Sequence, residues 1–235
     1  MNFAKYRLSE EEVLDILAKA GAVLANDHFV YTSGKHGSAY VNKDAIYPDI
    51  DATYKLCEAT AYEFLDQRVQ VVVGPVVGGV ILQWATAFHL REFAENVHSR
   101  GEVIGVYAEK VGEPFRYSDG TIAQHFTFYR GYGERLKGKR VLVVDDILTT
   151  GGSVQMVVKA VQEAGGEVIG VGVLVNRGGV TAEDIGVPKL FALANVSLDA
   201  WAEEDCPLCK NGVPVNTTIG KGREFVARQK ATVTA

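Results

Sequence analysis

Residues 141–153 read Val-Leu-Val-Val-Asp-Asp-Ile-Leu-Thr-Thr-Gly-Gly-Ser, and this stretch decides the fold. Its four leading apolar residues predict a buried strand, because strands of a parallel sheet covered on both faces are apolar on both sides. The small polar residues that follow predict a tight turn, and the run from Ser153 to Ala164 has helical periodicity. The stretch therefore indicates one strand–turn–helix unit of an α/β domain.

The turn after this strand has the composition of an anion site. Backbone N–H groups of a glycine-rich turn, continued by a helix N-terminus, bind phosphate, and the hydroxyls of Thr149, Thr150 and Ser153 add donors. Asp145 and Asp146 stand directly before the turn and would repel a bare phosphate. The combination therefore indicates a ligand that also carries hydroxyls or a bound cation, such as a sugar phosphate, at the carboxyl end of a strand.

Three other interpretations of this stretch are weaker. Receiver domains also place an acidic pair after a valine-rich strand, but the chain beyond Ser153 lacks their phospho-accepting aspartate and lysine at the set distances. A Walker-B aspartate would need a Gly-x4-Gly-Lys-Ser/Thr loop, which the sequence does not contain. A purely structural turn would not need two acids followed by so many small polar residues.

The rest of the chain alternates apolar strands with helices, which predicts a mostly parallel sheet in one domain. Ser9 and Glu12 form a capping box for a first helix. The stretch from Ala108 to Gly138 is polar and carries glycines and aromatic residues, and residues 221–235 are expected to form a frayed tail. Strands are expected at His28–Tyr31, Ser38–Asn42, Val69–Val73, Glu102–Tyr107, Arg140–Val144, Glu167–Val175 and Leu190–Val196, with further helices at Ala52–Asp66 and Val80–Phe93.

Composition excludes several classes of protein. The 235 residues are 47% hydrophobic and carry a net charge of −5, which argues against a nucleic-acid or anionic-membrane surface as the main partner. Three cysteines in a chain of this length do not make a disulfide framework and favour the cytoplasm. Residues 69–90 carry no charge, but the glycines and the proline in their middle indicate a strand, a turn and a buried helix rather than a membrane span.

Residues 141–153 resemble the phosphoribosyl-pyrophosphate motif of type I phosphoribosyltransferases. Further stretches resemble the branch of that family that uses orotate, and together they extend from about Phe29 to Pro214. They are Phe29–Asn42, similar to its N-terminal hood; Gly74–Gly79, similar to its pyrophosphate loop; Val175–Gly179, similar to the strand end where an arginine meets the orotate carboxylate; and Cys206–Pro214, similar to the ending of a short bacterial group.

The resemblance implies the fold of that family, a mostly parallel central sheet flanked by helices with a small N-terminal hood. It makes residues 1–220 one domain, with a core over about 50–196 and a hood of about 1–45 plus the C-terminal segment. It implies transfer of the 5-phosphoribosyl group from 5-phosphoribosyl 1-pyrophosphate to orotate, giving orotidine 5′-monophosphate and pyrophosphate. The alternatives are a purine base as acceptor, or a regulator that binds phosphoribosyl pyrophosphate without turnover; the acidic residues 1–28 argue against a DNA-binding segment.

The resemblance also implies a role for each site residue. Asp145 and Asp146 would hold the ribose hydroxyls, Lys110 would supply charge to the departing pyrophosphate and reach a neighbouring subunit of a homodimer, and Arg177 would pair with the orotate carboxylate. Mg²⁺ would arrive bound to the pyrophosphate, so no set of metal-binding side chains is expected. The segment around the 5′-phosphate would consist of Ile147, Leu148, Thr149, Thr150, Gly151, Gly152 and Ser153.

Several positions depart from the family pattern. Thr32 and Gly78 stand where lysines are usual in the hood and the pyrophosphate loop, and Glu109 stands where the mobile loop usually has arginine. The sequence does not decide which cations replace them; the candidates are Lys35, Lys43 and Arg130.

The spacing Cys206-x2-Cys209 offers half of a tetrahedral zinc site. Two cysteines of a partner subunit would complete such a site, whereas a proline-stiffened turn without metal is the favoured interpretation. His36 and His125 fall in expected loops and receive no role.

Overall fold

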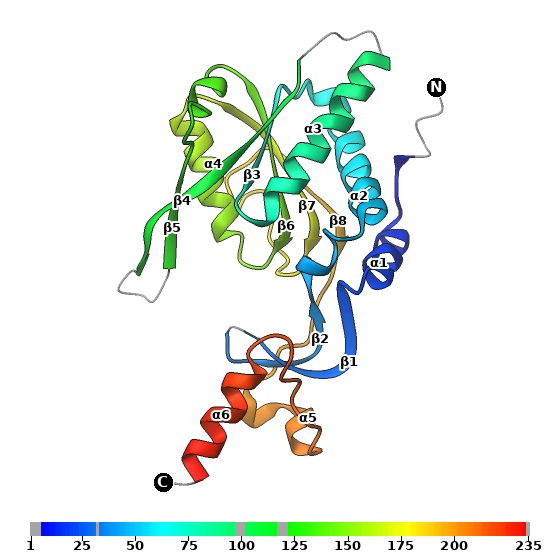
Figure 1. Ribbon diagram of the computed structural model, residues 1–235, viewed down its shortest axis with the longest axis vertical. Coiled ribbons are helices and arrows are strands. Elements are labelled where there is room, and N and C mark those ends of the chain that lie inside the picture. The colour runs from blue at the N-terminus through cyan, green and yellow to red at the C-terminus, as the bar shows by residue number, and fades with distance from the viewer. Residues whose placement is uncertain (1–5, 32, 97–101, 117–121, 234–235) are drawn as a thin grey trace.

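The computed structural model describes residues 6–31, 33–96, 102–116 and 122–233. Its centre is a six-stranded sheet in the order β5-β4-β3-β6-β7-β8, parallel except for the antiparallel pair β4–β5. Figure 1 shows this sheet at one end of the molecule and a separate hairpin, β1–β2, leading to the other end. The strands are β1 Val23–Val30, β2 His36–Val41, β3 Val71–Pro75, β4 Ile104–Arg116, β5 Ile122–Thr127, β6 Arg140–Leu148, β7 Glu167–Asn176 and β8 Leu190–Asn195.

Helices cover both faces of the sheet, as the apolar strands predict. Successive side chains of a strand point to opposite faces, so Val72 and Leu142 pack under α1, α2 and α3, whereas Val71 and Val143 pack under α4. The capping box between Ser9 and Glu12 forms at the start of α1 as predicted. The helices are α1 Glu10–Lys19, α2 Ile50–Glu63, α3 Gly78–Asn96, α4 Gly152–Glu163, α5 Pro207–Lys210 and α6 Gly222–Val233.

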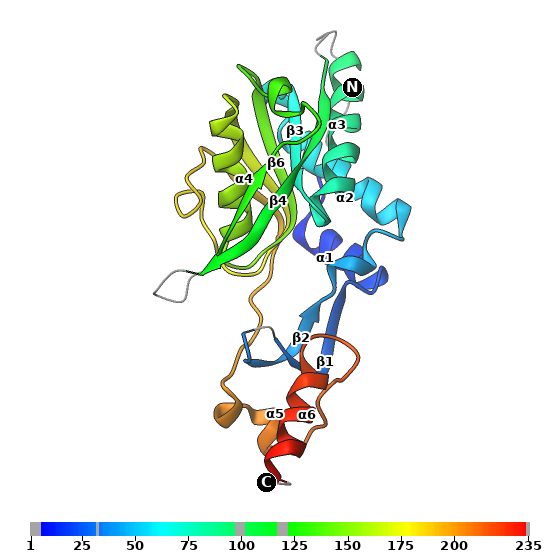
Figure 2. The same cartoon turned by 60° about the vertical axis from the view of Figure 1, so that its left-hand side comes forward.

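A small second unit is made of β1, β2, α5 and α6, and we call it the hood. Figure 2 shows it beyond the end of the sheet to which the strands point. The C-terminal segment is bound to the hairpin by backbone hydrogen bonds: His36 and Trp201 exchange two of 2.8 Å, and Lys221 N–H donates to the carbonyl of Val30. Helix α1, in contrast, packs with the core, because Val13 and Leu17 lie in the apolar cluster under α2 and α3.

Two expectations about local structure are wrong. Residues 221–235 do not form a frayed tail over their length, since α6 spans Gly222–Val233 and Phe225 is buried against the hood hairpin. The strand expected at Glu102–Tyr107 does not end there, because β4 continues to Arg116 and pairs with β5 in an antiparallel ribbon. Residues 110–113 are exposed, so the apolar periodicity that marks a buried strand is missing.

No helix in the parts of the chain that are described is long and apolar enough to cross a membrane. The uncharged residues 69–90 instead form β3, a short turn and most of α3, as the sequence predicts. β3 is buried along its whole length in the middle of the sheet.

Candidate active site

The loop from β6 to α4 is built to bring backbone close to a ligand. Gly151 has φ of +77°, and a Cβ there would lie 2.7 Å from Cγ2 of Ile185, so only glycine fits. Gly178 approaches from the next strand, where a side chain would overlap the carbonyl oxygen of Thr149. Helix α4 begins directly after the loop at Gly152, so its unpaired first N–H groups face the end of the strand. This is the arrangement that binds phosphate at helix N-termini.

Asp145 and Asp146 are the last acidic residues of β6, and both are buried. Asp145 Oδ1 accepts from the N–H of Asp146 at 2.9 Å, and Asp146 Oδ1 accepts from the N–H of Ile147 at 2.7 Å. Burial, together with the charge of Asp146, raises the pKa of Asp145 well above the usual range of an aspartate. Two carboxyl groups held this way favour a ligand that brings hydroxyl donors or a cation.

The other oxygen of Asp146 has two partners that belong to a short segment before α2. Tyr47 Oη donates to Asp146 Oδ2 at 2.7 Å, and Nζ of Lys43 lies 3.1 Å from the same oxygen. Although burial acts to lower it, the pKa of Lys43 is raised by the neighbouring charges of Asp146 and Asp145. Burial and Asp146 also raise the pKa of Tyr47, so its hydroxyl keeps its proton. Tyr47 could not be predicted as a site residue from the sequence. No motif marks a tyrosine that contacts Asp146, a residue far from it along the chain.

The turn between β3 and α3 faces the acidic pair, and its geometry explains one departure from the family pattern. A Cβ on Gly78 would overlap Oδ2 of Asp146, so a lysine at this position would require the Asp146 carboxylate to move. The carbonyl of Gly78 instead lies 2.9 Å from Oη of Tyr47. Lys43, one of the three candidate cations, lines the same cavity and places its charge beside Asp146.

These elements enclose a cavity of about 480 Å³ at the carboxyl ends of β3 and β6. Lys110 enters it from β4, where it pairs with Phe126 of β5, so the described part of this chain already supplies a lysine to its own cavity. The lining residues are Lys43, Pro75, Val76, Val77, Gly78, Lys110, Phe126 and every residue from Asp145 to Val154. The structure thus brings together Lys110 and the whole predicted segment 145–153.

Arg177 lies beside this cavity but does not line it. It directly follows β7, and its N–H donates to the carbonyl of Leu148 at 2.8 Å, which places it next to the phosphate-type loop. Its guanidinium lies 5.2 Å from the ring centroid of Tyr31, at the end of the hood hairpin. Tyr31 is itself held by its hydroxyl, which donates to the carbonyl of Ala39 at 2.6 Å. Arg177 therefore stands between the loop and the hood.

The two remaining candidate cations lie elsewhere. Arg130 forms an ion pair with Glu109 and is exposed, and Lys35 is exposed in the hairpin turn. Neither is among the residues that line the cavity.

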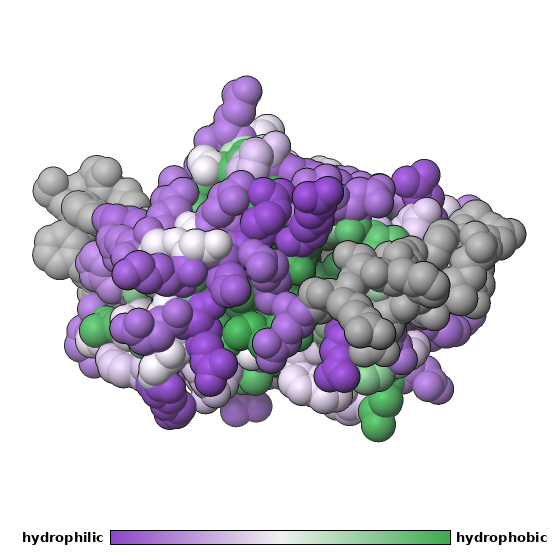
Figure 3. Space-filling view, turned by 90° about the horizontal axis from the view of Figure 1, so that it is seen from above, coloured by the Kyte–Doolittle hydropathy of each residue, from purple (hydrophilic) through white to green (hydrophobic). Residues whose placement is uncertain are grey.

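A larger cleft, of about 930 Å³, lies at the opposite edge of the sheet, where the strands begin. Figure 3 looks onto this end of the molecule, which is mainly hydrophilic with small separate apolar areas. Several of its charges are already paired: Glu63 contacts both Lys189 and Arg7, and Arg140 contacts Glu167. We place the active site at the smaller cavity, because ligands of open α/β sheets bind at the carboxyl ends of the strands.

Comparison with known proteins shows the family of this chain. Residues 45–202 match the model of the phosphoribosyl transferase domain. Orotate phosphoribosyltransferase from Desulforamulus reducens is 36% identical over 88% of this chain and 95% of the relative, and that from Pelotomaculum thermopropionicum is 36% identical with the same coverage. The chain belongs to the phosphoribosyltransferase family. Its resemblance to that family, inferred from residues 141–153, is confirmed.

Solved structures of phosphoribosyltransferases share the fold. Orotate phosphoribosyltransferase of Mycobacterium tuberculosis superposes with a TM-score of 0.57 over 80% of this chain and 96% of the other, at 22% identity. Adenine phosphoribosyltransferase of Rhodothermus marinus superposes with a TM-score of 0.53 over 78% of this chain and 98% of the other, at 20% identity. At this level of identity both confirm the predicted α/β fold with a mostly parallel sheet, and neither distinguishes the acceptor base.

Proposed function

We propose that this phosphoribosyltransferase transfers the 5-phosphoribosyl group from phosphoribosyl pyrophosphate to orotate, giving orotidine 5′-monophosphate and pyrophosphate. The observation that carries the choice of orotate is the position of Arg177, whose backbone N–H donates to the cavity-lining Leu148 and whose guanidinium lies over the ring of Tyr31 on the hood side. A guanidinium there offers a planar fork to a carboxylate, and orotate is the pyrimidine that carries one. The relatives at 36% identity, which are named orotate phosphoribosyltransferases, support the same choice.

The donor substrate, phosphoribosyl pyrophosphate, fits the cavity with its 5′-phosphate at the loop between β6 and α4 and its ribose at the acidic pair. The backbone N–H groups of residues 149–152 and the start of α4 bind the 5′-phosphate, helped by the hydroxyls of Thr149, Thr150 and Ser153. Asp145 and Asp146 accept hydrogen bonds from the ribose 2′- and 3′-hydroxyls. Because Asp145 is buried beside a second acid, hydroxyl donors relieve a repulsion that exists before binding.

Lysines in the cavity act on the leaving group. The bond from ribose C1 to the pyrophosphate oxygen breaks and the pyrophosphate leaves with the electron pair, while orotate N1, whose acidic proton is released to water, forms the new bond to C1. Lys110 on β4 and Lys43 near Asp146 place fixed positive charge where that negative charge develops. Bound with the pyrophosphate, Mg²⁺ would neutralise further charge there, and the carboxylates of Asp145 and Asp146 are the hard oxygen donors that suit it.

Arg177 is expected to decide how well orotate is used. Arg177→Lys keeps the charge but loses the planar fork, and Arg177→Ala loses both, so kcat/KM for orotate should fall in the lysine variant and further in the alanine variant. A charged hydrogen-bonded pair contributes about 1.5–3 kcal/mol, or roughly tenfold to more than a hundredfold in kcat/KM. Steady-state kinetics with orotate as the varied substrate measures the series.

Two controls belong to that series. Uracil lacks the carboxylate, so its slow turnover should be nearly the same in all three proteins. Arg135→Ala removes an exposed arginine remote from the cavity and should leave orotate kinetics unchanged. Equal orotate kinetics in wild type, Arg177→Lys and Arg177→Ala would remove the main structural reason for choosing orotate.

We also propose that the enzyme is a homodimer joined through the α3 stripe, which we define as Val77, Ile81, Trp84 and Phe88. The four recur at helical spacing and are exposed, Trp84 by 66% of its surface. Trp84 and Phe88 stack with their ring centroids 5.8 Å apart, which presents a flat apolar face. The stripe begins at Val77, which lines the cavity, so a second copy seated on it would lie at the edge of the active site.

Trp84→Glu is expected to convert the dimer to a monomer, because it places a charge in the centre of the stripe at a side chain that is mostly exposed in one chain. Tyr129→Glu is the matched control, since Tyr129 is also an exposed aromatic residue but lies outside the stripe. Sedimentation velocity over a range of protein concentrations measures both. A monomeric wild type, or a Trp84→Glu protein that still sediments as a dimer, would refute this interface.

We place the enzyme in the cytoplasm on the chemistry of its cysteines. All three are free thiols in the structure, one in the core and two in the hood. Free thiols persist in a reducing compartment.

A further inference from the structure

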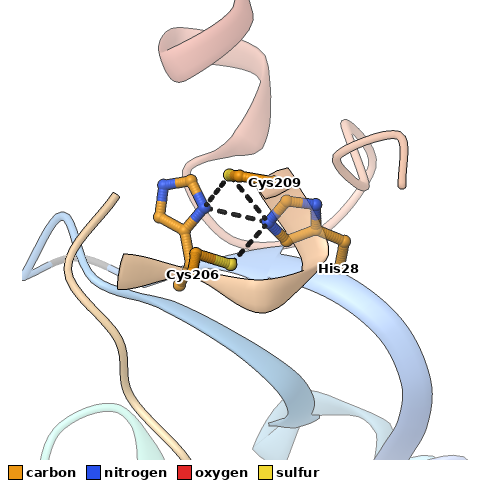
Figure 4. A group of neighbouring side chains, drawn as sticks. His28, Cys206 and Cys209 are labelled. Atoms are coloured by element: carbon orange, nitrogen blue, oxygen red, sulfur yellow. Dashed lines mark hydrogen bonds between the residues drawn. The ribbon is translucent and has the colours of Figure 1, made fainter. Parts of the chain in front are cut away.

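Four side chains with the chemistry of metal ligands meet in the hood, away from the proposed active site. They are His28, His36, Cys206 and Cys209, and one ligand atom of each lies within 4.8 Å of those of the others. Figure 4 shows two imidazoles and two thiols turned toward one point, one histidine from each strand of the hairpin and both cysteines from the segment around α5. Both histidines and Cys206 are buried, and Cys209 is partly buried.

The distances match the edges of a tetrahedron around zinc. With the usual Zn–N and Zn–S bond lengths, a nitrogen and a sulfur ligand are separated by about 3.6 Å. Nε2 of His28 lies 3.6 Å from Sγ of Cys206 and 3.7 Å from Sγ of Cys209. Nδ1 of His36 lies 3.3 Å from Sγ of Cys209 and 2.9 Å from Nε2 of His28.

One histidine is already oriented by a second contact. Nδ1 of His28 lies 2.8 Å from the carbonyl oxygen of Val213, a group that can only accept, so this nitrogen carries the proton. Nε2 then presents a lone pair to the cluster. Metal-binding histidines in proteins are oriented in this way, with the outer nitrogen donating to a carbonyl or carboxylate.

The local fold explains why the four meet. Val30 pairs with His36 across the hairpin, and His28 precedes Val30 by two residues, so both imidazoles lie on one face of the ribbon. Cys206 caps the start of the single turn of α5 and Cys209 lies three residues later within it, a spacing that brings their thiols to the same side. Hydrogen bonds from Trp201 to His36 and from Asn216 to the carbonyl of His28 then hold that turn against the hairpin.

We propose that His28, His36, Cys206 and Cys209 bind one Zn²⁺ in a closed, structural site that fastens the C-terminal segment to the hood hairpin. Two thiolates and two imidazoles are the ligand set of structural zinc, and four protein ligands leave no position for a substrate. The hood needs such a fastening, because a two-stranded hairpin with two short helices has little apolar core of its own. This inference does not depend on which base the enzyme uses.

The site bears on the active site through the hairpin. Tyr31 follows β1 directly, and its ring contacts the guanidinium of Arg177. Zinc at His28 and His36 would fix the two strands on either side of the turn that carries Tyr31. We therefore assign the four ligands a positioning role toward the orotate end of the cavity and no contact with substrate.

Metal analysis of the wild-type protein tests the proposal without any variant. Protein expressed with zinc in the medium and purified without chelator should contain about one zinc per chain by plasma mass spectrometry. After zinc is exchanged for Co²⁺, the protein should show the strong visible bands of a tetrahedral, thiolate-ligated ion. A wild-type protein that contains no zinc and shows only the weak spectrum of octahedral Co²⁺ would overturn the site.

Variants show whether the zinc is bound by these four residues or adventitiously elsewhere on the protein. Cys206→Ser and Cys209→Ser should each lose the zinc and unfold at a lower temperature, whereas Cys57→Ala, which removes the one cysteine in the core, should keep a full equivalent. Removing zinc from the wild type with a chelator should lower its melting temperature, and zinc added back should restore it. Zinc retained in full by Cys209→Ser would refute the ligand set.

Discussion

The double substitution Asp145→Asn with Asp146→Asn should abolish phosphoribosyl transfer and leave the fold intact. Each asparagine keeps the size of the side chain but loses the charge that accepts a ribose hydroxyl. A lost charged hydrogen bond costs about 1.5–3 kcal/mol, so the pair should lower kcat/KM by roughly two to four orders of magnitude. The rate of pyrophosphate release at phosphoribosyl pyrophosphate concentrations well below KM measures the loss.

The melting temperature of the Asp145→Asn variant is an internal control, because it shows whether the substituted protein is still folded. The pKa of Asp145 is raised in the folded protein by burial and by Asp146, so its ionisation costs folding free energy, and this cost grows from the pKa of the unfolded chain until the pH passes the raised pKa of the folded state. Replacing Asp145 with a neutral side chain removes that cost. The melting temperature of the single variant Asp145→Asn at neutral pH should therefore stay the same or rise, whereas Asp146→Asn also removes the ion pair with Lys43. Near-normal turnover in the double variant would show that the acidic pair does not bind the ribose.

Lys110→Ala should lower kcat far more than it weakens substrate binding. Its charge acts as the pyrophosphate leaves, and an interaction made mainly in the transition state lowers kcat and kcat/KM together. The expected loss is about tenfold to more than a hundredfold, from the same range for a charged contact. Lys159→Ala, on the exposed side of α4, is the matched control and should have no effect.

An experiment with mixed dimers shows whether Lys110 acts in the cavity of its own chain or in that of the neighbouring subunit. It lines the cavity of its own chain, whereas the family resemblance implies that it reaches a neighbouring subunit. Dimers that combine a Lys110→Ala chain with an Asp145→Asn, Asp146→Asn chain regain activity only if Lys110 acts across the interface. A Lys110→Ala enzyme with unchanged kcat would assign the charge on pyrophosphate to Lys43 instead.

Much of the core fold could be predicted from the sequence, because burial leaves a direct trace in it. β3 and β6 are apolar on both faces, since helices cover both sides, and they were found within a few residues. The ribbon β4–β5 and helix α6 were missed because their exposed faces leave no apolar periodicity. Phe225 is a large apolar side chain that anchors α6, but a single buried residue makes no periodic pattern from which a helix could be predicted.

The candidate site likewise has one part that could be predicted from the sequence and another that could not. Residues 145–153 are contiguous, and the chemistry of a phosphate loop can be read from their order. Tyr47 and the pairing of Lys43 with Asp146 depend on segments far apart in the chain, as does the meeting of His28 and His36 with the two cysteines. Cys206-x2-Cys209 suggested half of a zinc site, and the completing histidines were invisible because only the hairpin register brings them there.

The identity of the acceptor base is the central claim, and one assay tests it most directly. Purified protein with Mg²⁺ and phosphoribosyl pyrophosphate is given orotate, uracil, adenine, guanine or hypoxanthine in turn, and pyrophosphate release is followed. We expect rapid release with orotate, slow release with uracil and none with the purines. Release driven by a purine but not by orotate, or by none of the bases, would contradict the assignment.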